Sequence, residues 1–453
     1  MIKIFCLLIF MIGVIRYLTS PFKSIRVAKF HLLSMLIQSL AVYPLLIQTM
    51  RTKELAKHLD FSCPYESYTG LYFPTIIALI ILIISYKKEK WNWSEVFFPL
   101  IFFSLGFVYS YLTPYNQSKY ATTMALLVII QIFFVVYVVK SYIPSRLLIK
   151  CVYDGFCIII ILNAFISITY VLLHIDFIQN LFINFEGNIR EGATYRRAYG
   201  TTNQPNRLGA LCSLISMFFL SCYCFDFRRK LSICLFCVSC VTVLLSQSRS
   251  AFSALTVSSV FLFLLLQYKR NEMQVSRFIF YTFLLSFGYF LFSDLAIIQE
   301  MFFNSNVGEM QDARMGHYAL GWMCVEDSNY MGVGINANTH YLAYAIKNYG
   351  FENWLYMHSI HSVHMGIMAE LGLGGIILWA FYVMSRYARI VVTPIRKIES
   401  PIICYSFLGM LTIIVLHGFS DNVYMHYQYL LIACIFGAGY KISNSSDLNK
   451  LMK

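Results

Sequence analysis

The sequence predicts an all-α polytopic membrane protein with about 12–13 transmembrane helices. Of its 453 residues, 58% are hydrophobic and only 13% are charged, whereas a soluble domain has about 25% charged residues because its surface must be wetted. The apolar residues cluster into long runs, and in lipid such runs form helices that satisfy their own backbone hydrogen bonds. The expected spans are 2–18, 30–49, 71–86, 95–112, 120–139, 151–175, 207–225, 231–246, 251–268, 278–293, 364–385, 402–419 and 427–440.

The composition also limits the domain organisation and the partners. No Gly/Ser-rich or Pro-rich linker separates the apolar runs, so we expect residues 1–453 to form a single membrane domain. The net charge of +13 does not indicate a nucleic-acid partner, because the basic residues lie in short clusters between apolar runs. Most of the 13 cysteines lie inside expected spans, where cysteine acts as a small apolar residue. The segment 2–18 has no small-residue cleavage site behind it and is therefore expected to be a retained span.

The distribution of lysine and arginine predicts the orientation. Alternate loops carry 23 of the 35 basic residues, and the positive-inside rule makes their side cytoplasmic, with the C-terminus inside. Two long segments then lie outside: an arginine-rich loop at 176–206, and a larger loop at 294–363 before the last three spans. Long loops tend to carry function, so we expect the working face to be the external one.

The first external loop contains an unusual amount of positive charge. Arginine presents a planar fork that matches phosphate oxygens, and Pro205-Asn206 breaks the chain just before a span, which aims a helix N-terminus at any anion held there. The alternative is that these arginines pair with nearby acids or lipid headgroups. The four arginines are Arg190, Arg196, Arg197 and Arg207.

Two further arginines lie at points where charge is not expected. Arg249 belongs to the short polar break Ser246–Ser250 between two apolar runs, and such charges are usually functional, although an arginine there could also snorkel to headgroups. Arg314 precedes residues 316–327, which are expected to form a short amphipathic helix before a turn at Gly332-Val-Gly334.

Three histidines precede a span that contains Glu370. His358, His361 and His364 are spaced three residues apart, so on a helix they would share one broad face. A neutral imidazole is a ready general base near pH 7. A metal site is less favoured, because no acidic or cysteine ligand falls in the pattern, and a core or headgroup-facing role is the other alternative. Asp421, at the external end of a span, could orient an imidazole or an arginine, or cap a helix.

Taken in order, these motifs resemble the O-antigen ligase and polymerase superfamily, the class C membrane glycosyltransferases that use polyprenyl-diphosphate-linked glycans. The resemblance extends over about half of the chain, from Arg196 to Asp421. The motifs are Arg197-x-x-Gly200 with Asn203 and Pro205-Asn206; Ser248-Arg249-Ser-Ala251; Arg314 and Trp322 before Gly332-x-Gly334; His361 nine residues before Glu370-x-Gly372-x-x-Gly375; and Gly418-x-Ser-Asp421.

The resemblance implies a role for each matching residue. Arginines at the positions of Arg197, Arg249 and Arg314 would hold the diphosphate, and His361 would act as the general base without metal or cofactor. Residues with supporting roles are Asn206, Asp421 and Glu370. The chain departs from the family where His-Asn is usual and His361-Ser362 stands, so that His358 or His364 could be the true equivalent, and the proline before the Gly-x-Gly turn is absent.

The resemblance covers polymerases and ligases alike, and the aromatic-rich, weakly patterned N-terminal half favours a polymerase. Such an enzyme would join undecaprenyl-diphosphate-linked repeat units at the periplasmic face of a bacterial inner membrane. Its partners would be glycan donor and acceptor, membrane lipids and a chain-length regulator. A ligase that transfers the glycan to lipid A–core is the nearest alternative, since donor handling is shared. A transporter or flippase for lipid-linked sugars is less favoured, because such folds show internal repeats and buried charge, whereas this sequence has almost no mid-span charge.

Overall fold

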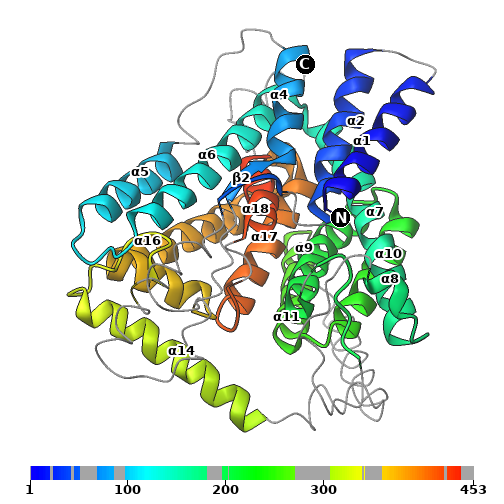
Figure 1. Ribbon diagram of the computed structural model, residues 1–453. Helices are drawn as coiled ribbons and strands as arrows, with labels where there is room; N and C mark the ends of the chain where they lie inside the picture. Colours follow the sequence, from blue (N-terminus) through cyan, green and yellow to red (C-terminus); the bar gives the residue numbers. More distant parts are fainter. Residues whose placement is uncertain are drawn as a thin grey trace.

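The protein is an all-α polytopic membrane protein with one short two-stranded sheet (Figure 1). The computed structural model describes residues 2–20, 24–41, 45–50, 69–85, 97–180, 196–202, 204–270, 307–338, 341, 360–422 and 426–439. Its elements are α1 Ile2–Leu18, α2 Ile25–Gln38, η1 Ser39–Ala41, β1 Leu45–Met50, β2 Thr69–Tyr72, α4 Phe73–Ser85, α5 Phe97–Leu112, α6 Lys119–Tyr142, α7 Ser145–Val171, α8 Asp176–Asn180, α9 Pro205–Cys224, α10 Arg229–Leu245, α11 Arg249–Lys269, α14 Val307–Asp327, α16 Val363–Val392, η4 Ile395–Lys397, α17 Pro401–His417 and α18 Tyr427–Gly439.

Most of the expected spans correspond to described helices. In the described ranges, five helices are long and apolar enough to cross a membrane, namely α6, α7, α9, α11 and α16. Shorter apolar helices occupy other expected spans, including 71–86, 402–419 and 427–440. The expected span 278–293 lies outside the described residues.

The expected span 30–49 is wrong in its second half. Helix α2 ends at Gln38, and β1 pairs antiparallel with β2. The sequence contains the reason, because Pro44 has no backbone N–H to donate and disfavours a helical conformation in the residue before it. Hydropathy averaged over a window does not register this single residue.

Helix α9 lies at the centre of the bundle, in contact with α7, α10, α11 and α17. Its N-terminal end lies against that of α11, because a Cβ atom on Gly209 would stand only 2.9 Å from Ser248 Cβ and 3.0 Å from Ala251 Cβ. Small residues allow this close approach of two helices in a membrane. The N-termini of α9 and α11 are therefore side by side at the same end of the bundle.

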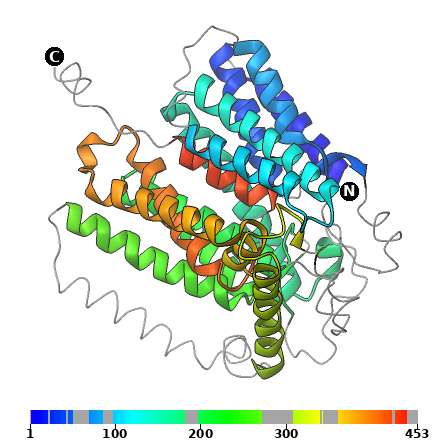
Figure 2. The same ribbon diagram turned by 90° about the vertical axis from the view of Figure 1, so that its left-hand side faces the viewer.

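The outer helices expose apolar side chains, as lipid-facing helices do. Helix α16 presents Ile377, Phe381 and Met384, each more than 60% exposed. Helix α14 lies at the periphery next to α16 in both views of the ribbon (Figure 1, Figure 2).

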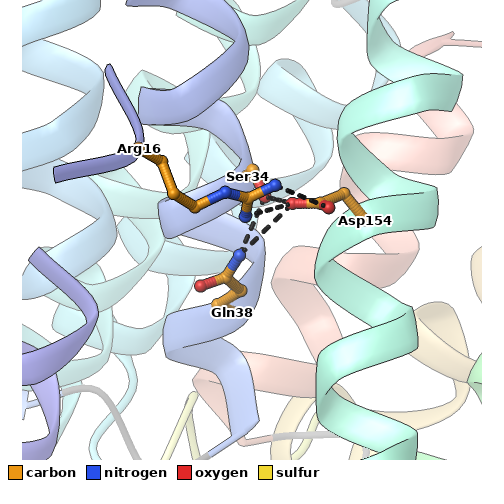
Figure 3. Close-up of polar contacts among 4 residues, drawn as sticks. All are labelled: Arg16, Ser34, Gln38 and Asp154. Carbon is orange, nitrogen blue, oxygen red and sulfur yellow. Dashed lines mark hydrogen bonds and ion pairs between the residues drawn. The ribbon is translucent and has the colours of Figure 1, made fainter. Parts of the chain in front are cut away.

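An ion pair connects three helices of the N-terminal half (Figure 3). Arg16 of α1 donates through both terminal nitrogens to the Asp154 carboxylate of α7, at 2.9 and 3.0 Å. Ser34 and Gln38 of α2 also donate to Asp154. Asp154, near the start of the expected span 151–175, is thus paired with an arginine that is far away in sequence.

Candidate active site

Arg197 lies against the turn that precedes α11. Its Nε donates to the carbonyl oxygen of Ser246 at 3.3 Å, and one terminal nitrogen donates to the carbonyl oxygen of Gln247 at 3.4 Å. Arg249 is the first residue of α11. Two of the arginines that the sequence singled out thus belong to neighbouring segments, although Arg197 and Gln247 are 50 residues apart.

Buried polar groups fix the shape of the loop that carries Arg197. Gly200 has a φ of +56°, and a Cβ there would stand 2.2 Å from Asn163 Oδ1, so only glycine fits without strain. The same Oδ1 atom accepts the backbone N–H of Thr201 at 2.8 Å, and Gln179 donates to the carbonyl of Gly200 at 2.7 Å. The Ala198 N–H donates to a carbonyl at the end of α10. The position of Arg197 is therefore set from several helices.

The arginines of this loop make different contacts. Arg196 forms an ion pair with Asp176, and its guanidinium lies 5.3 Å from the ring centroid of Tyr170. The alternative hypothesis, that the arginines of this loop pair with nearby acids, is therefore correct for Arg196. Arg197 instead donates to the carbonyl oxygens of Ser246 and Gln247 and to the amide oxygen of Asn206. Arg190 lies outside the described residues.

Asn206 connects Arg197 to Asp421. Its Oδ1 accepts from Arg197 at 3.2 Å, and its Nδ2 donates to the Asp421 carboxylate at 2.8 Å. Asp421 lies after the end of α17, and the next described helix begins six residues later, so it is not placed as an N-cap. The carboxylate instead orients the Asn206 amide, which in turn presents its oxygen to Arg197.

Arg207 contacts a histidine that the sequence reasoning missed. It donates to His426 Nε2 at 3.2 Å, and since arginine only donates, His426 must accept. Burial and the Arg207 charge lower the pKa of His426 well below its usual value, which keeps this ring neutral. The lone histidine between the last two expected spans was the available signal.

His361 precedes α16 and does not belong to it. Ser362 is the N-cap: its Oγ accepts from the Met365 N–H at 3.3 Å and donates to the Gly418 carbonyl at 3.0 Å. The expected helical face shared by three histidines is therefore wrong, because a serine side chain that caps the first turn starts the helix after His361. His358 lies outside the described residues.

His364 has both ring nitrogens engaged. Its Nε2 lies 2.9 Å from the carbonyl oxygen of Val415, and its Nδ1 accepts from the Trp379 indole at 3.2 Å. A neutral ring that donates at one nitrogen and accepts at the other has no nitrogen left to take a proton from a substrate. These contacts indicate a structural role for His364.

The two glycine motifs of the sequence meet at a break in α16. Gly372 has a φ of +64° inside the helix, and Gly332 and Gly334 have φ values of +86° and +103°. A Cβ on Gly372 would stand 2.2 Å from the Tyr330 carbonyl oxygen. Backbone groups freed by the break pair with the loop, as an interrupted membrane helix requires. The bonds run from Val333 N to Ala369 O, from Gly334 N to Glu370 O and from Leu373 N to Tyr330 O.

Glu370 supports this junction from within. Its side chain is buried, and Oε1 accepts from Asn338 at 2.9 Å. The loop beyond Gly334 is fixed on its other side, where Thr122 donates to the Ile335 carbonyl at 2.8 Å. Among the described residues, Glu370 therefore contacts the loop that packs against the break in α16.

Helix α14 is longer than expected, and it contacts the turn that leads to Asp421. It begins at Val307 instead of residue 316, and Tyr318 donates to the Phe419 carbonyl in the turn that leads to Asp421. Arg314 lies on α14 one turn before His317, and its side chain is outside the described part of the structure. Among the described residues, no group of three or more His, Cys, Asp and Glu side chains could hold a metal ion.

A family model described as O-antigen ligase matches residues 234–380, about a third of the chain. The matched region includes Arg249, Arg314, His361 and Glu370. No curated protein matches the chain.

Proposed function

We propose that this member of the O-antigen ligase and polymerase superfamily is a periplasmic-face polymerase of undecaprenyl-diphosphate-linked repeat units. The observation that carries the proposal is the hydrogen-bonded chain Arg197–Asn206–Asp421, which lies where the N-termini of α9 and α11 meet. Helix N-termini and guanidinium groups both favour anions, and a diphosphate is the anion that a lipid-linked glycan donor brings.

The arginines would act on the leaving group. When the bond between the anomeric carbon and the diphosphate breaks, negative charge grows on the phosphate oxygens, and fixed guanidinium groups stabilise it most in a poorly hydrated site. Arg197 is held in advance by Ser246, Gln247 and Asn206, so little reorganisation accompanies the reaction. Arg249 and Arg314 are proposed to complete the site.

His361 would act as the general base. The acceptor hydroxyl attacks the anomeric carbon as His361 takes its proton, the glycosidic bond forms, and the diphosphate leaves with the bonding electron pair. The alternative His364 is engaged at both nitrogens, which supports His361. The proton then returns to solvent or to the released diphosphate.

Purified protein in lipid nanodiscs, supplied with lipid-linked repeat units, tests the proposal. We expect glycan ladders from wild type and none from His361→Ala, while chelators leave wild-type turnover unchanged. Full turnover in a correctly inserted Arg197→Ala protein would refute the diphosphate role. Loss of wild-type activity on EDTA treatment, with recovery on adding metal, would refute the metal-free mechanism.

The alternative is a ligase that transfers the glycan to lipid A–core; the family model that matches residues 234–380 is described as O-antigen ligase. A lipopolysaccharide gel of a deletion strain separates the two functions. Loss of the ladder with one repeat unit retained indicates a polymerase, whereas bare core indicates a ligase. Bare core from a strain whose lipid-linked precursor stays at the cytoplasmic face would instead indicate transport.

A further inference from the structure

A second imidazole contacts His361. The rings of His317 and His361 lie edge to face, with their centroids 4.7 Å apart and their planes at 81°. His317 is buried, at 5% exposed, and belongs to α14, whereas His361 is partly buried and lies just before α16. The proposed mechanism does not use His317.

The face of α14 that carries His317 is packed firmly against the His361 segment. Leu320 and Cys324 share a small apolar core with Ile360 and Ala369. Gly321 lies so close that a Cβ atom there would stand 2.3 Å from the Met365 Cγ atom. Since residues 317, 320, 321 and 324 follow helical spacing, they form one stripe, and His317 is the member of that stripe nearest the site.

The next residue of α14 is also tied to the site. The Tyr318 hydroxyl donates to the Phe419 carbonyl, in the same turn whose Gly418 carbonyl accepts from Ser362. His317 thus contacts His361 itself, and Tyr318 contacts the turn to which Ser362 is bonded. This end of α14 cannot shift without disturbing both of them.

We propose that His317 is a positioning residue for His361, an inference that rests on the proposed function. The terminal torsion of a histidine side chain is broad, so an imidazole outside a helix needs a neighbour to fix its plane. The edge-to-face contact with His317 supplies one such neighbour. A general base must reach the proton within hydrogen-bond distance, and a displacement of about 1 Å can cost on the order of 100-fold in rate.

The test compares ring-retaining and ring-deleting variants of the full chain in nanodiscs. His317→Phe keeps a planar ring at the same place, and we expect it to retain most of the wild-type kcat. His317→Leu has similar bulk but no ring, and we expect its kcat to fall by about 10- to 100-fold, with the KM for lipid-linked donor unchanged. Met315→Ala, an exposed position on the same helix, is the matched control.

Three outcomes overturn the inference: wild-type kcat in His317→Leu, a raised KM at unchanged kcat, or an inactive but well-folded His317→Phe. If His317→Leu does not elute as a monodisperse protein, His317→Gln takes its place with the same expectation. His361→Ala separates this inference from the proposed function. Full turnover in His361→Ala contradicts the function itself, whereas an inactive His361→Ala beside a fully active His317→Leu contradicts only the positioning role.

Discussion

The ion pair between Arg16 and Asp154 predicts an uneven response to mutation. Arg16→Met leaves the carboxylate inside the bundle with only Ser34 and Gln38 as donors. Removing one partner of a fully buried pair costs about 3–5 kcal/mol, and because the two side chains here are 36% and 24% exposed, we expect the lower end, about 3 kcal/mol. Asp154→Leu costs less, about 1 kcal/mol, since Arg16 lies near the end of α1 and can snorkel to the surface.

The double variant Arg16→Met/Asp154→Leu is expected to unfold within about 1 kcal/mol of wild type, because apolar replacement of an ion pair is often neutral. The coupling energy from the double-mutant cycle is then about 3–5 kcal/mol. Reversible unfolding in mixed micelles, with denaturing detergent titrated and helicity followed by circular dichroism, measures each free energy. Arg26→Ala, at an exposed position on α2, is the control and should change stability by less than about 0.5 kcal/mol.

Additive single-variant effects would refute this reasoning. If the double variant loses as much stability as the two single variants combined, the two charges do not interact energetically. Equal stability of Arg16→Met and wild type would show that the Asp154 carboxylate does not need its partner.

Four further predictions concern the candidate site. Arg197→Lys should be nearly as inactive as Arg197→Ala in the nanodisc assay, because lysine offers one point charge and no fork. His361→Ala should lose about 10²–10⁴ in turnover yet retain donor in a binding assay. Gly372→Ala should destabilise the protein by about 1–3 kcal/mol in a thermal melt, because its φ of +64° is strained for alanine, while Gly374→Ala, with nothing near the added atom, should not. The lowered pKa of His426 means that the unfolded state binds a proton more readily than the folded state, so stability should fall as pH drops below about 6.5; His426→Gln should show a smaller fall, measured as melting temperature against pH.

The sequence was informative where one local feature decides the outcome. Apolar runs predicted nearly all of the described helices, and Pro205 marked the start of α9. The sequence also predicted that Arg197 and Arg249 lie on the same side of the membrane, because each precedes the external end of an expected span. Hydropathy failed between residues 45 and 50, which follow a proline that an apolar average does not register.

Contacts between distant side chains could not be read from the sequence. Arg16 and Asp154 are 138 residues apart, and a window average hides a single carboxylate in an apolar run. The contact between His317 and His361 depends on how α14 packs on α16, and helical periodicity alone does not specify a neighbour. The N-cap role of Ser362 needed its partner Gly418, from a later span.

The break at Gly372 divides α16 into two segments with different surroundings. The first segment, which follows Ser362, is anchored by backbone bonds to the loop around Gly334 and to the turn at Gly418. The second carries the exposed apolar side chains such as Phe381. Because a helix bends where its bond ladder is interrupted, we expect a change in the tilt of the outer segment, in a thinner or thicker bilayer, to occur at Gly372. We therefore expect the lipid-facing half of α16 to adjust to the membrane thickness while the half beside His361 keeps its orientation.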